Sequence, residues 1–142
     1  MKNGLLFSIL FFLIAACKQE RKNLLPDISK ADSATVMFYK QPPNHRFFTI
    51  VKIRNAADLN AITRDVNTAV IQEKQDCASW GKIYFYQGKE AVQVVYFSLE
   101  QSCGIFSFIL NGEKYVVPMS DASNKLLQAL KERSVELPSS TE

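Results

Sequence analysis

Few residues in this chain are of the types that carry out metal or nucleophilic chemistry. The chain has three cysteines and a single histidine, His45. Zinc and other transition metals require clustered Cys, His, Asp or Glu ligands at recognisable spacings. A Ser–His–Asp set would depend on His45, which follows two prolines, and the chain has no Gly-x-Ser-x-Gly motif. We therefore expect no metal, no cofactor and no nucleophilic catalytic centre.

Carboxylate chemistry remains open, because the two acidic groups of a glycoside hydrolase are paired in space and not in sequence. Seven acidic residues fall mostly at expected helix surfaces, turns and strand ends: Asp58, Asp65, Glu73, Asp76, Glu90, Glu100 and Glu113. Solvated charges normally occupy such places. Hydrolysis is accordingly the least favoured function for this chain.

The first cysteine, Cys17, lies where an apolar segment meets a polar one. Residues 1–3 are a short positive segment, and residues 5–14 are apolar apart from Ser8, which is typical of a signal peptide and too short to span a bilayer comfortably. The sequence Ile14-Ala15-Ala16-Cys17 resembles the lipobox of bacterial lipoproteins. This resemblance implies that residues 1–16 are removed and that Cys17 carries diacylglycerol and palmitate-type acyl chains. An ordinary secretory signal with a chance cysteine is the alternative.

The lipoprotein resemblance also implies a location. Two or more acyl chains hold a protein durably on a bilayer, and the residue after the cysteine is Lys18 where inner-membrane lipoproteins usually have aspartate. The expected location is the cell envelope, at the outer membrane. We expect residues 17–32 to form a lipidated flexible tether, residues 33–135 a single domain, and residues 136–142 a disordered C-terminal tail.

Residue patterns in the domain predict strands followed by a helix. The β-branched and aromatic segments 35–39 and 47–53 predict a hairpin, with a stiff loop over Lys40–Arg46 that contains two prolines. Asn55 is a good N-cap for the helix that follows. In that helix, four apolar residues recur at spacings of three and four: Leu59, Ile62, Val66 and Val70.

After this helix the apolar period changes to two, over residues 82–86, 91–99, 104–110 and 114–117. The links are short, and Asn111-Gly112 is the preferred pair for a type I′ turn, so these segments predict an antiparallel meander. A last helix follows, with Ser120 and Ser123 as rival N-caps. The order ββαββββα predicts an α+β two-layer sandwich, an antiparallel sheet packed by two helices. The layout resembles small bacterial envelope lipoproteins of unknown function.

Cys77 and Cys103 remain as an even pair in an exported protein. They precede the two strands that flank segment 91–99, and these outer strands run parallel in a meander, so both cysteines lie at the same end of the sheet. Cys77 is several residues ahead of its strand and can cross the end of the middle one. A disulfide is the expected outcome. A redox-active pair is the alternative, but it lacks the Cys-x-x-Cys spacing.

Aromatic residues on neighbouring strands suggest a binding surface. Tyr84, Tyr86 and, by the same alternation, Trp80 are expected on one face of the sheet. If no helix covers that face, it could bind a peptide, a glycan or a partner protein; cross-strand packing is the alternative. A net charge of +3 without clustered basic residues disfavours nucleic acid.

These observations favour a non-enzymatic, lipid-anchored envelope module whose partner, an envelope protein or glycan, binds the sheet face or the Lys40–Arg46 loop. An inhibitor or sensor of a periplasmic hydrolase is the second hypothesis, for which that loop would have to protrude.

Overall fold

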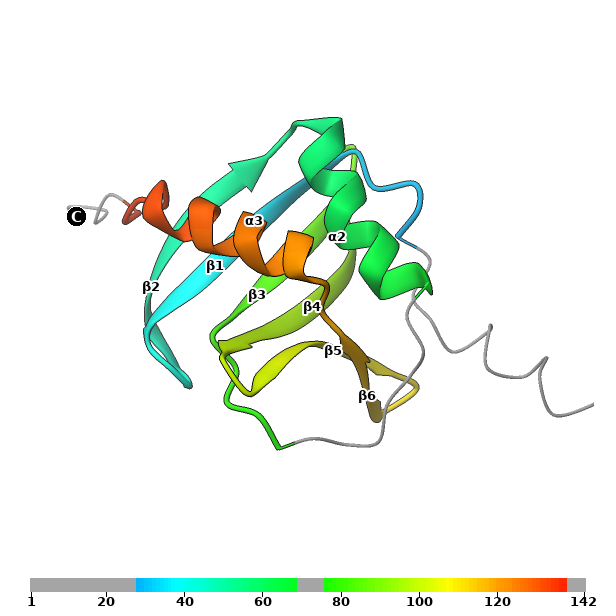
Figure 1. Ribbon diagram of the computed structural model, residues 1–142. Coiled ribbons are helices and arrows are strands. Elements are labelled where there is room, and N and C mark those ends of the chain that lie inside the picture. The colour runs from blue at the N-terminus through cyan, green and yellow to red at the C-terminus, as the bar shows by residue number, and fades with distance from the viewer. Residues whose placement is uncertain (1–27, 69–75, 138–142) are drawn as a thin grey trace, which may run out of the picture.

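The computed structural model describes residues 28–68 and 76–137. Within them the chain forms a six-stranded antiparallel sheet and two helices, an α+β fold whose order is consistent with the predicted one. The elements are β1 (Ser33–Gln41), β2 (Asn44–Ile53), α2 (Ala56–Thr68), β3 (Gly81–Gln87), β4 (Glu90–Glu100), β5 (Cys103–Leu110), β6 (Glu113–Pro118) and α3 (Asp121–Glu132). Figure 1 shows both helices lying across the same face of the sheet.

The strand order across the sheet is β2-β1-β3-β4-β5-β6. Strands β3 to β6 form the predicted meander, and β1 lies between β2 and β3, antiparallel to both. The β5–β6 turn has positive φ angles at Asn111 (52°) and Gly112 (81°). A type I′ turn requires positive φ at both central residues, which confirms the turn expected from this pair.

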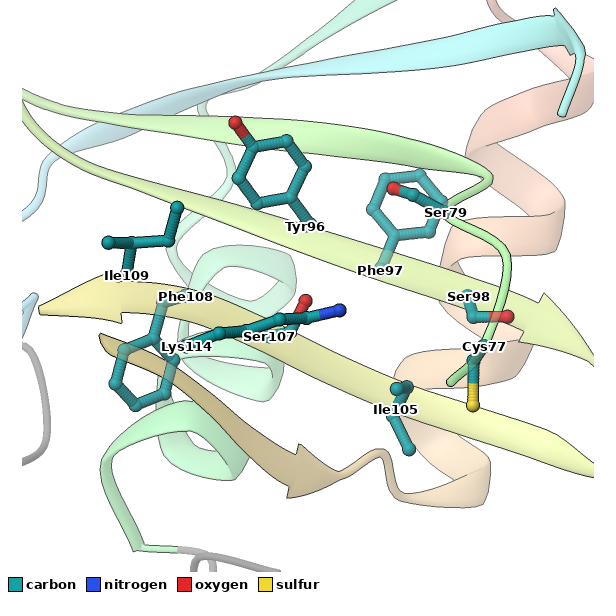
Figure 2. Close-up of a pocket in the computed structure, with 10 residues that line it drawn as sticks. All are labelled: Cys77, Ser79, Tyr96, Phe97, Ser98, Ile105, Ser107, Phe108, Ile109 and Lys114. Atoms are coloured by element: carbon teal, nitrogen blue, oxygen red, sulfur yellow. The ribbon is translucent and has the colours of Figure 1, made fainter. Parts of the chain in front are cut away.

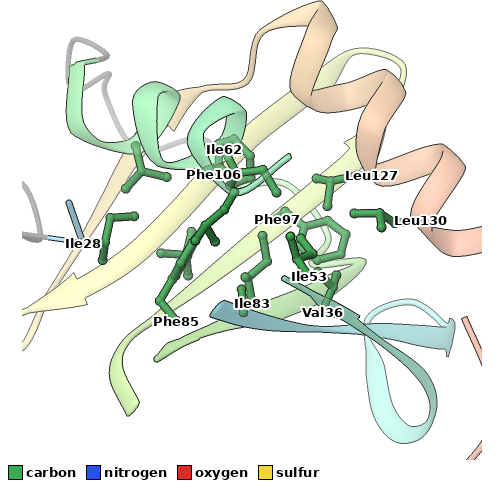
Figure 3. Packing of buried hydrophobic residues seen from close by; sticks show 14 of the residues in the cluster. Ile28, Val36, Ile53, Ile62, Ile83, Phe85, Phe97, Phe106, Leu127 and Leu130 are labelled. Atoms are coloured by element: carbon green, nitrogen blue, oxygen red, sulfur yellow. The ribbon is translucent and has the colours of Figure 1, made fainter. Parts of the chain in front are cut away.

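The hydrophobic core fills the space between the helices and the covered face of the sheet (Figure 3). Helix α2 contributes Leu59, Ile62 and Val66, as its spacing predicted; Val70 lies outside the described residues. Helix α3 contributes Leu127 and Leu130. Alternate residues of the strands complete the core, among them Val36, Phe38, Ile83, Phe85, Val95, Phe97, Phe106, Phe108 and Val117.

A polar contact between the helices fixes the start of α3. Ser120 is the N-cap, and its Oγ accepts a hydrogen bond from the N–H of Ser123 at 3.2 Å, which decides between the two expected caps. The Ser120 N–H and Oγ–H both donate to Asp65 Oδ2 of α2, at 2.8 and 2.7 Å. Because Asp65 is largely buried, its carboxylate is occupied by a structural role.

The folded domain extends beyond the boundaries predicted for it. Ile28, assigned by sequence to the tether, is fully buried in the core. At the other end, Ile50 and Val135, the last residue of the predicted domain, exchange backbone hydrogen bonds of 2.8 and 2.9 Å, and Glu136, one residue past that boundary, forms an ion pair with Lys40. These contacts cover part of the exposed edge of β2, as edge strands usually require. The signal peptide, the lipobox, residues 17–27 and residues 138–142 lie outside the described part of the chain.

The prediction of a stiff loop over residues 40–46 is wrong. Strand β1 continues to Gln41 and β2 begins at Asn44, so only Pro42 and Pro43 form the turn. The ladder continues past Tyr39 because a register shift precedes the Gln41–Asn44 pair. Both prolines therefore lie outside the ladder, where their missing N–H groups cost no hydrogen bond.

Candidate functional site on the open face of the sheet

The face of the sheet opposite the helices carries a row of side chains that the strand registers place in order. We call this the open face. Its central row, from β2 to β6, is Ile50, Met37, Lys82, Tyr96, Ser107 and Val116. With strands about 4.8 Å apart, the row spans about 24 Å. Among the described residues, no helix packs on this side (Figure 1).

Lys82 lies among three tyrosines near the middle of the open face. Its Nζ is 5.0 Å from the centre of the Tyr84 ring, Tyr96 is its cross-strand neighbour on β4, and Tyr39 lies diagonally on β1. We call Tyr39, Lys82, Tyr84 and Tyr96 the tyrosine–lysine cluster. Tyr39 is buried, and the other three side chains are half-buried. The cluster thus presents a cation and aromatic surface together.

The electrostatics of this cluster favour the charged form of the lysine. The pKa of Lys82 is raised, first by hydrogen bonding with the Tyr84 side chain and then by the neighbouring phenols, against an opposing effect of burial. Burial raises the pKa of Tyr39, while the charge on Lys82 opposes that rise. No carboxylate of the described residues forms an ion pair with Lys82. Its ammonium is therefore open to an anionic partner.

Among the described strand residues, those on the open face carry more positive than negative charge. The strand registers also place Lys52 on β2 and Lys114 on β6 toward this side. One acidic residue, Glu100, faces the same way at the end of β4. Three lysines spread over the sheet against one glutamate at its end give a surface that suits an anionic partner.

A hollow of about 230 Å³ lies on the same face, over β4, β5 and β6. One of its walls is the segment Cys77–Ser79, which crosses the sheet before β3 begins (Figure 2). The disulfide between Cys77 and Cys103 ties this segment to the start of β5, with the two Cα atoms 6.0 Å apart. The bond confirms the predicted pairing, and the predicted path of Cys77 across the end of the middle strand explains how the cysteines meet.

Trp80 does not join Tyr84 and Tyr86 on the open face, which corrects that expectation. Its side chain packs against the core from the helix side, with Lys131 Nζ of α3 4.8 Å from its ring. Trp80 precedes the first residue of β3, Gly81, so the alternation of the strand does not govern it. Tyr84 and Tyr86 are half-buried and lie on the open face.

The end of the β1–β2 hairpin is the second exposed feature. The last residue of β1 paired with β3 is Phe38, so the hairpin continues beyond the neighbouring strand. Residues 43–47 are exposed, and Phe47 keeps 55% of its surface accessible. His45, the single histidine, contacts the Tyr39 ring edge-on at 6.4 Å between centroids, which gives it a packing role.

Two of the acidic residues that could have supported hydrolysis are engaged in other contacts. Asp65 holds the start of α3 through Ser120, and Glu113 accepts a hydrogen bond from Tyr115 at 3.0 Å. Glu73 lies outside the described residues. Within the described part of the chain no group of three His, Cys, Asp or Glu side chains is arranged to hold a metal ion, and the hollow is lined by no carboxylate.

Sequence reasoning missed Lys82, Lys114, Ser107 and Tyr39 as members of the site. For Lys82 the signal was present, because it shares the alternation that placed Tyr84 and Tyr86 together. The contributions of Ser107, Lys114 and Tyr39 depend on which strands become neighbours and on the path of the Cys77 segment. Those are properties of the assembled sheet.

Comparison with known proteins does not identify the chain. No protein-family model matches it, and no curated protein or solved structure is significantly similar to it. Among the described residues, no helix has the length and apolar character needed to cross a membrane.

Proposed function

We propose that this protein is a lipid-anchored module of the bacterial cell envelope, a two-layer α+β sandwich that binds an anionic partner through the open face of its sheet. The observation that carries the proposal is the tyrosine–lysine cluster: half-buried tyrosines around a lysine that has no acidic partner in the described residues. Tyrosine is enriched where proteins recognise partners, and an ammonium group beside it favours a partner of opposite charge. The partner class is an envelope protein or glycan with acidic groups.

The membrane attachment rests on the sequence Ile14-Ala15-Ala16-Cys17, which resembles a lipobox. The folded part begins by Ile28, which is buried in the core. Eleven residues from Cys17 to Ile28, as a flexible chain, would reach roughly 20 Å. The open face would then lie within reach of envelope components close to the bilayer, and Lys18 supports outer-membrane sorting.

Two matched experiments test the two halves of this proposal. Cys17→Ser should release the protein from the membrane fraction of its own cells and abolish incorporation of labelled palmitate, while Cys77→Ser keeps both. Membrane retention of Cys17→Ser would contradict lipid anchoring.

Capture of envelope components by the lipidated full chain tests the binding face. Lys82→Glu reverses the central charge of the open face, so it should strongly reduce recovery of a specific partner. Lys125→Glu reverses an exposed charge on α3 and should leave recovery unchanged. Equal recovery with both variants would exclude the open face as the binding surface.

The inhibitor or sensor hypothesis keeps one supporting observation, the exposed end of the β1–β2 hairpin with Phe47 at its surface. An inhibitor of this type would insert the hairpin end into a hydrolase. Replacing residues 42–46 by glycine and serine should abolish inhibition of a periplasmic hydrolase if this hypothesis holds; unchanged inhibition would discard it.

A further inference from the structure

The hollow over β4–β6 has the composition of a small ligand site. Its walls are mostly apolar and include Tyr96, Ile105 and Ile109, with the disulfide-held Cys77–Ser79 segment on one side. Among the described residues that line it, the single charged one is Lys114. Small-molecule sites typically combine apolar walls with a few polar groups that orient the ligand. An apolar hollow with one cation favours an apolar molecule that carries one negative charge.

Ser107 supplies a second polar group. Its side chain is only 7% exposed, and its Oγ makes no hydrogen bond to any described residue. In the described chain, every fully enclosed polar side-chain atom has a hydrogen-bond partner. The Ser107 hydroxyl has none, so it is not fully enclosed, and it is reached through the hollow that Ser107 lines. A hydroxyl left without a partner in an apolar setting is unfavourable. A ligand oxygen would satisfy it.

Lys114 and Ser107 are placed to act on one ligand group. Lys114 pairs with Ile109 and Ser107 with Val116 in the β5–β6 ladder, so the two are diagonal neighbours on one face. Figure 2 shows the Lys114 side chain extending across Ser107, with its nitrogen directed over the hollow. No acidic side chain in the described residues forms an ion pair with Lys114. Its ammonium is free to pair with a ligand.

We propose that the hollow binds a medium-chain monocarboxylate: the hydrocarbon chain lies between Tyr96, Ile105 and Ile109, and the carboxylate pairs with Lys114 and accepts a hydrogen bond from Ser107. An apolar cavity of about 150 Å³ accommodates benzene, so 230 Å³ suits a ligand of about ten non-hydrogen atoms. Octanoate has this size and charge. Tyr96 belongs both to the tyrosine–lysine cluster and to the wall of the hollow. The carboxylate contacts do not rest on the partner-binding function proposed above, because Lys114 and Ser107 lie outside that cluster.

The test is a titration of the full chain, held in zwitterionic nanodiscs, with sodium octanoate. Carbon-13-labelled isoleucine methyl groups report position by NMR: Ile105 and Ile109 line the hollow, Ile50 lies elsewhere on the open face, and Ile62 lies in the core. The proposal predicts saturable shifts at Ile105 and Ile109, half-complete at roughly 0.1–1 mM for a ligand this small. Ile50 and Ile62 should stay unchanged.

Two variants test the carboxylate contacts. Lys114→Gln should weaken octanoate binding by roughly three- to tenfold, less than for a buried ion pair because Lys114 is exposed. Ser107→Ala, which adds no volume, should weaken it by roughly three- to tenfold as well. Lys125→Gln, which removes an exposed charge from α3, should have no effect. An unchanged Ile62 signal shows that each variant is folded.

The alternatives give distinct results that would overturn the proposal. Shifts that rise linearly without saturation would mean partition into the lipid. Equal affinity for octanoate and octan-1-ol, or for wild type and Lys114→Gln, would mean that no carboxylate is recognised. Saturable shifts at Ile50 without shifts at Ile105 and Ile109 would show that the ligand binds outside the hollow. Each of these results concerns octanoate alone, so loss of partner capture in Lys82→Glu remains a separate result.

Discussion

The two faces of this sheet are built from the same strands but differ in what they leave available. On the covered face, side chains such as Phe85, Phe106 and Phe108 are fully buried beneath α2 and α3. On the open face, Lys82, Tyr84 and Tyr96 are half-buried, and no helix of the described residues lies over them. Alternation along each strand separates the two sets. Packing against the helices explains the large apolar side chains of the covered face. We propose that recognition of a partner explains the lysine and tyrosines of the open face.

This difference separates stability from function. Burial of large apolar side chains is the main favourable contribution to folding, so substitutions on the covered face should be measured in unfolding. Side chains that stay half-exposed contribute less to folding and remain free to contact another molecule. Substitutions on the open face should therefore affect binding more than unfolding.

The largest expected effect is on the covered face. Phe106 is fully buried, so Phe106→Ala should lower the free energy of unfolding by about 3–5 kcal/mol, because it leaves a cavity as well as losing apolar burial. The matched substitution on the open face, Phe48→Ala, removes a half-buried ring and should cost roughly 1–2 kcal/mol. Urea denaturation measures both. Equal losses of unfolding free energy in the two variants would contradict the difference between the faces.

The disulfide is the next contribution in size. The Cys77→Ser/Cys103→Ser double variant releases a loop closed over a sequence separation of 26 residues. On the chain-entropy model this should lower the free energy of unfolding by roughly 3.5 kcal/mol. Urea denaturation of the variant and of the oxidised wild type gives the value. If the two unfold identically, the bond does not restrain the Cys77–Ser79 segment in the way proposed for the hollow.

Two glycines on the covered face give a paired test of packing. A Cβ at Gly81 would lie 2.1 Å from the Met37 carbonyl oxygen and 2.5 Å from Phe97 Cζ. Gly81→Ala should therefore destabilise the protein by about 1–3 kcal/mol. At Gly104 the nearest atom is Asn124 Nδ2, 3.7 Å away, so Gly104→Ala should be neutral or slightly stabilising. Thermal unfolding distinguishes them; a reversed order would show that the two contacts are misassigned.

On the open face we expect a small effect on stability together with a large one on binding. Tyr84→Thr keeps a residue that favours strands and should change the free energy of unfolding by about 1 kcal/mol or less, the size of a cross-strand pair. The same substitution should reduce recovery of the partner, because the aromatic ring next to Lys82 is lost. Circular dichroism melts and quantitative capture provide the two readouts. Strong destabilisation with normal recovery would assign Tyr84 to packing alone.

The smallest effect is electrostatic and depends on pH. The pKa of Asp32 is lowered from its usual value of 3.8, chiefly because the carboxylate accepts a hydrogen bond from the Gly88 N–H at 2.6 Å, and also from Ser33. A depressed pKa adds stability above pH 3.8, and that stability is lost as the pH falls further through the folded-state value. Wild type should therefore exceed Asp32→Asn in stability at pH 7, and the difference should shrink as the pH falls below 3.8. A constant difference would contradict this.

Local sequence signals were sufficient for much of this fold. The helical spacing of Leu59, Ile62 and Val66, the Asn111-Gly112 turn and the even cysteine pair each depend on residues close in sequence or on simple strand geometry. The prediction of a loop over residues 40–46 was wrong because the β1–β2 ladder continues through a register shift. The two prolines in the sequence give no indication of that shift. The position predicted for the Trp80 side chain was wrong because the alternation of side chains does not extend beyond the end of a strand. The hollow depends on three strands and a crossing segment that meet only in the folded chain.

Site-specific photo-crosslinking in living cells tests the central claim, that the open face binds the partner, most directly. The crosslinking residue p-benzoylphenylalanine would replace Tyr84 in the lipid-anchored full chain, and Lys125 on the exposed side of α3 in a matched control. The account predicts a discrete adduct of one envelope component from position 84, lost when Lys82→Glu is added, and none from position 125. Adducts from position 125 alone, or an adduct at 84 that is insensitive to Lys82→Glu, would contradict it.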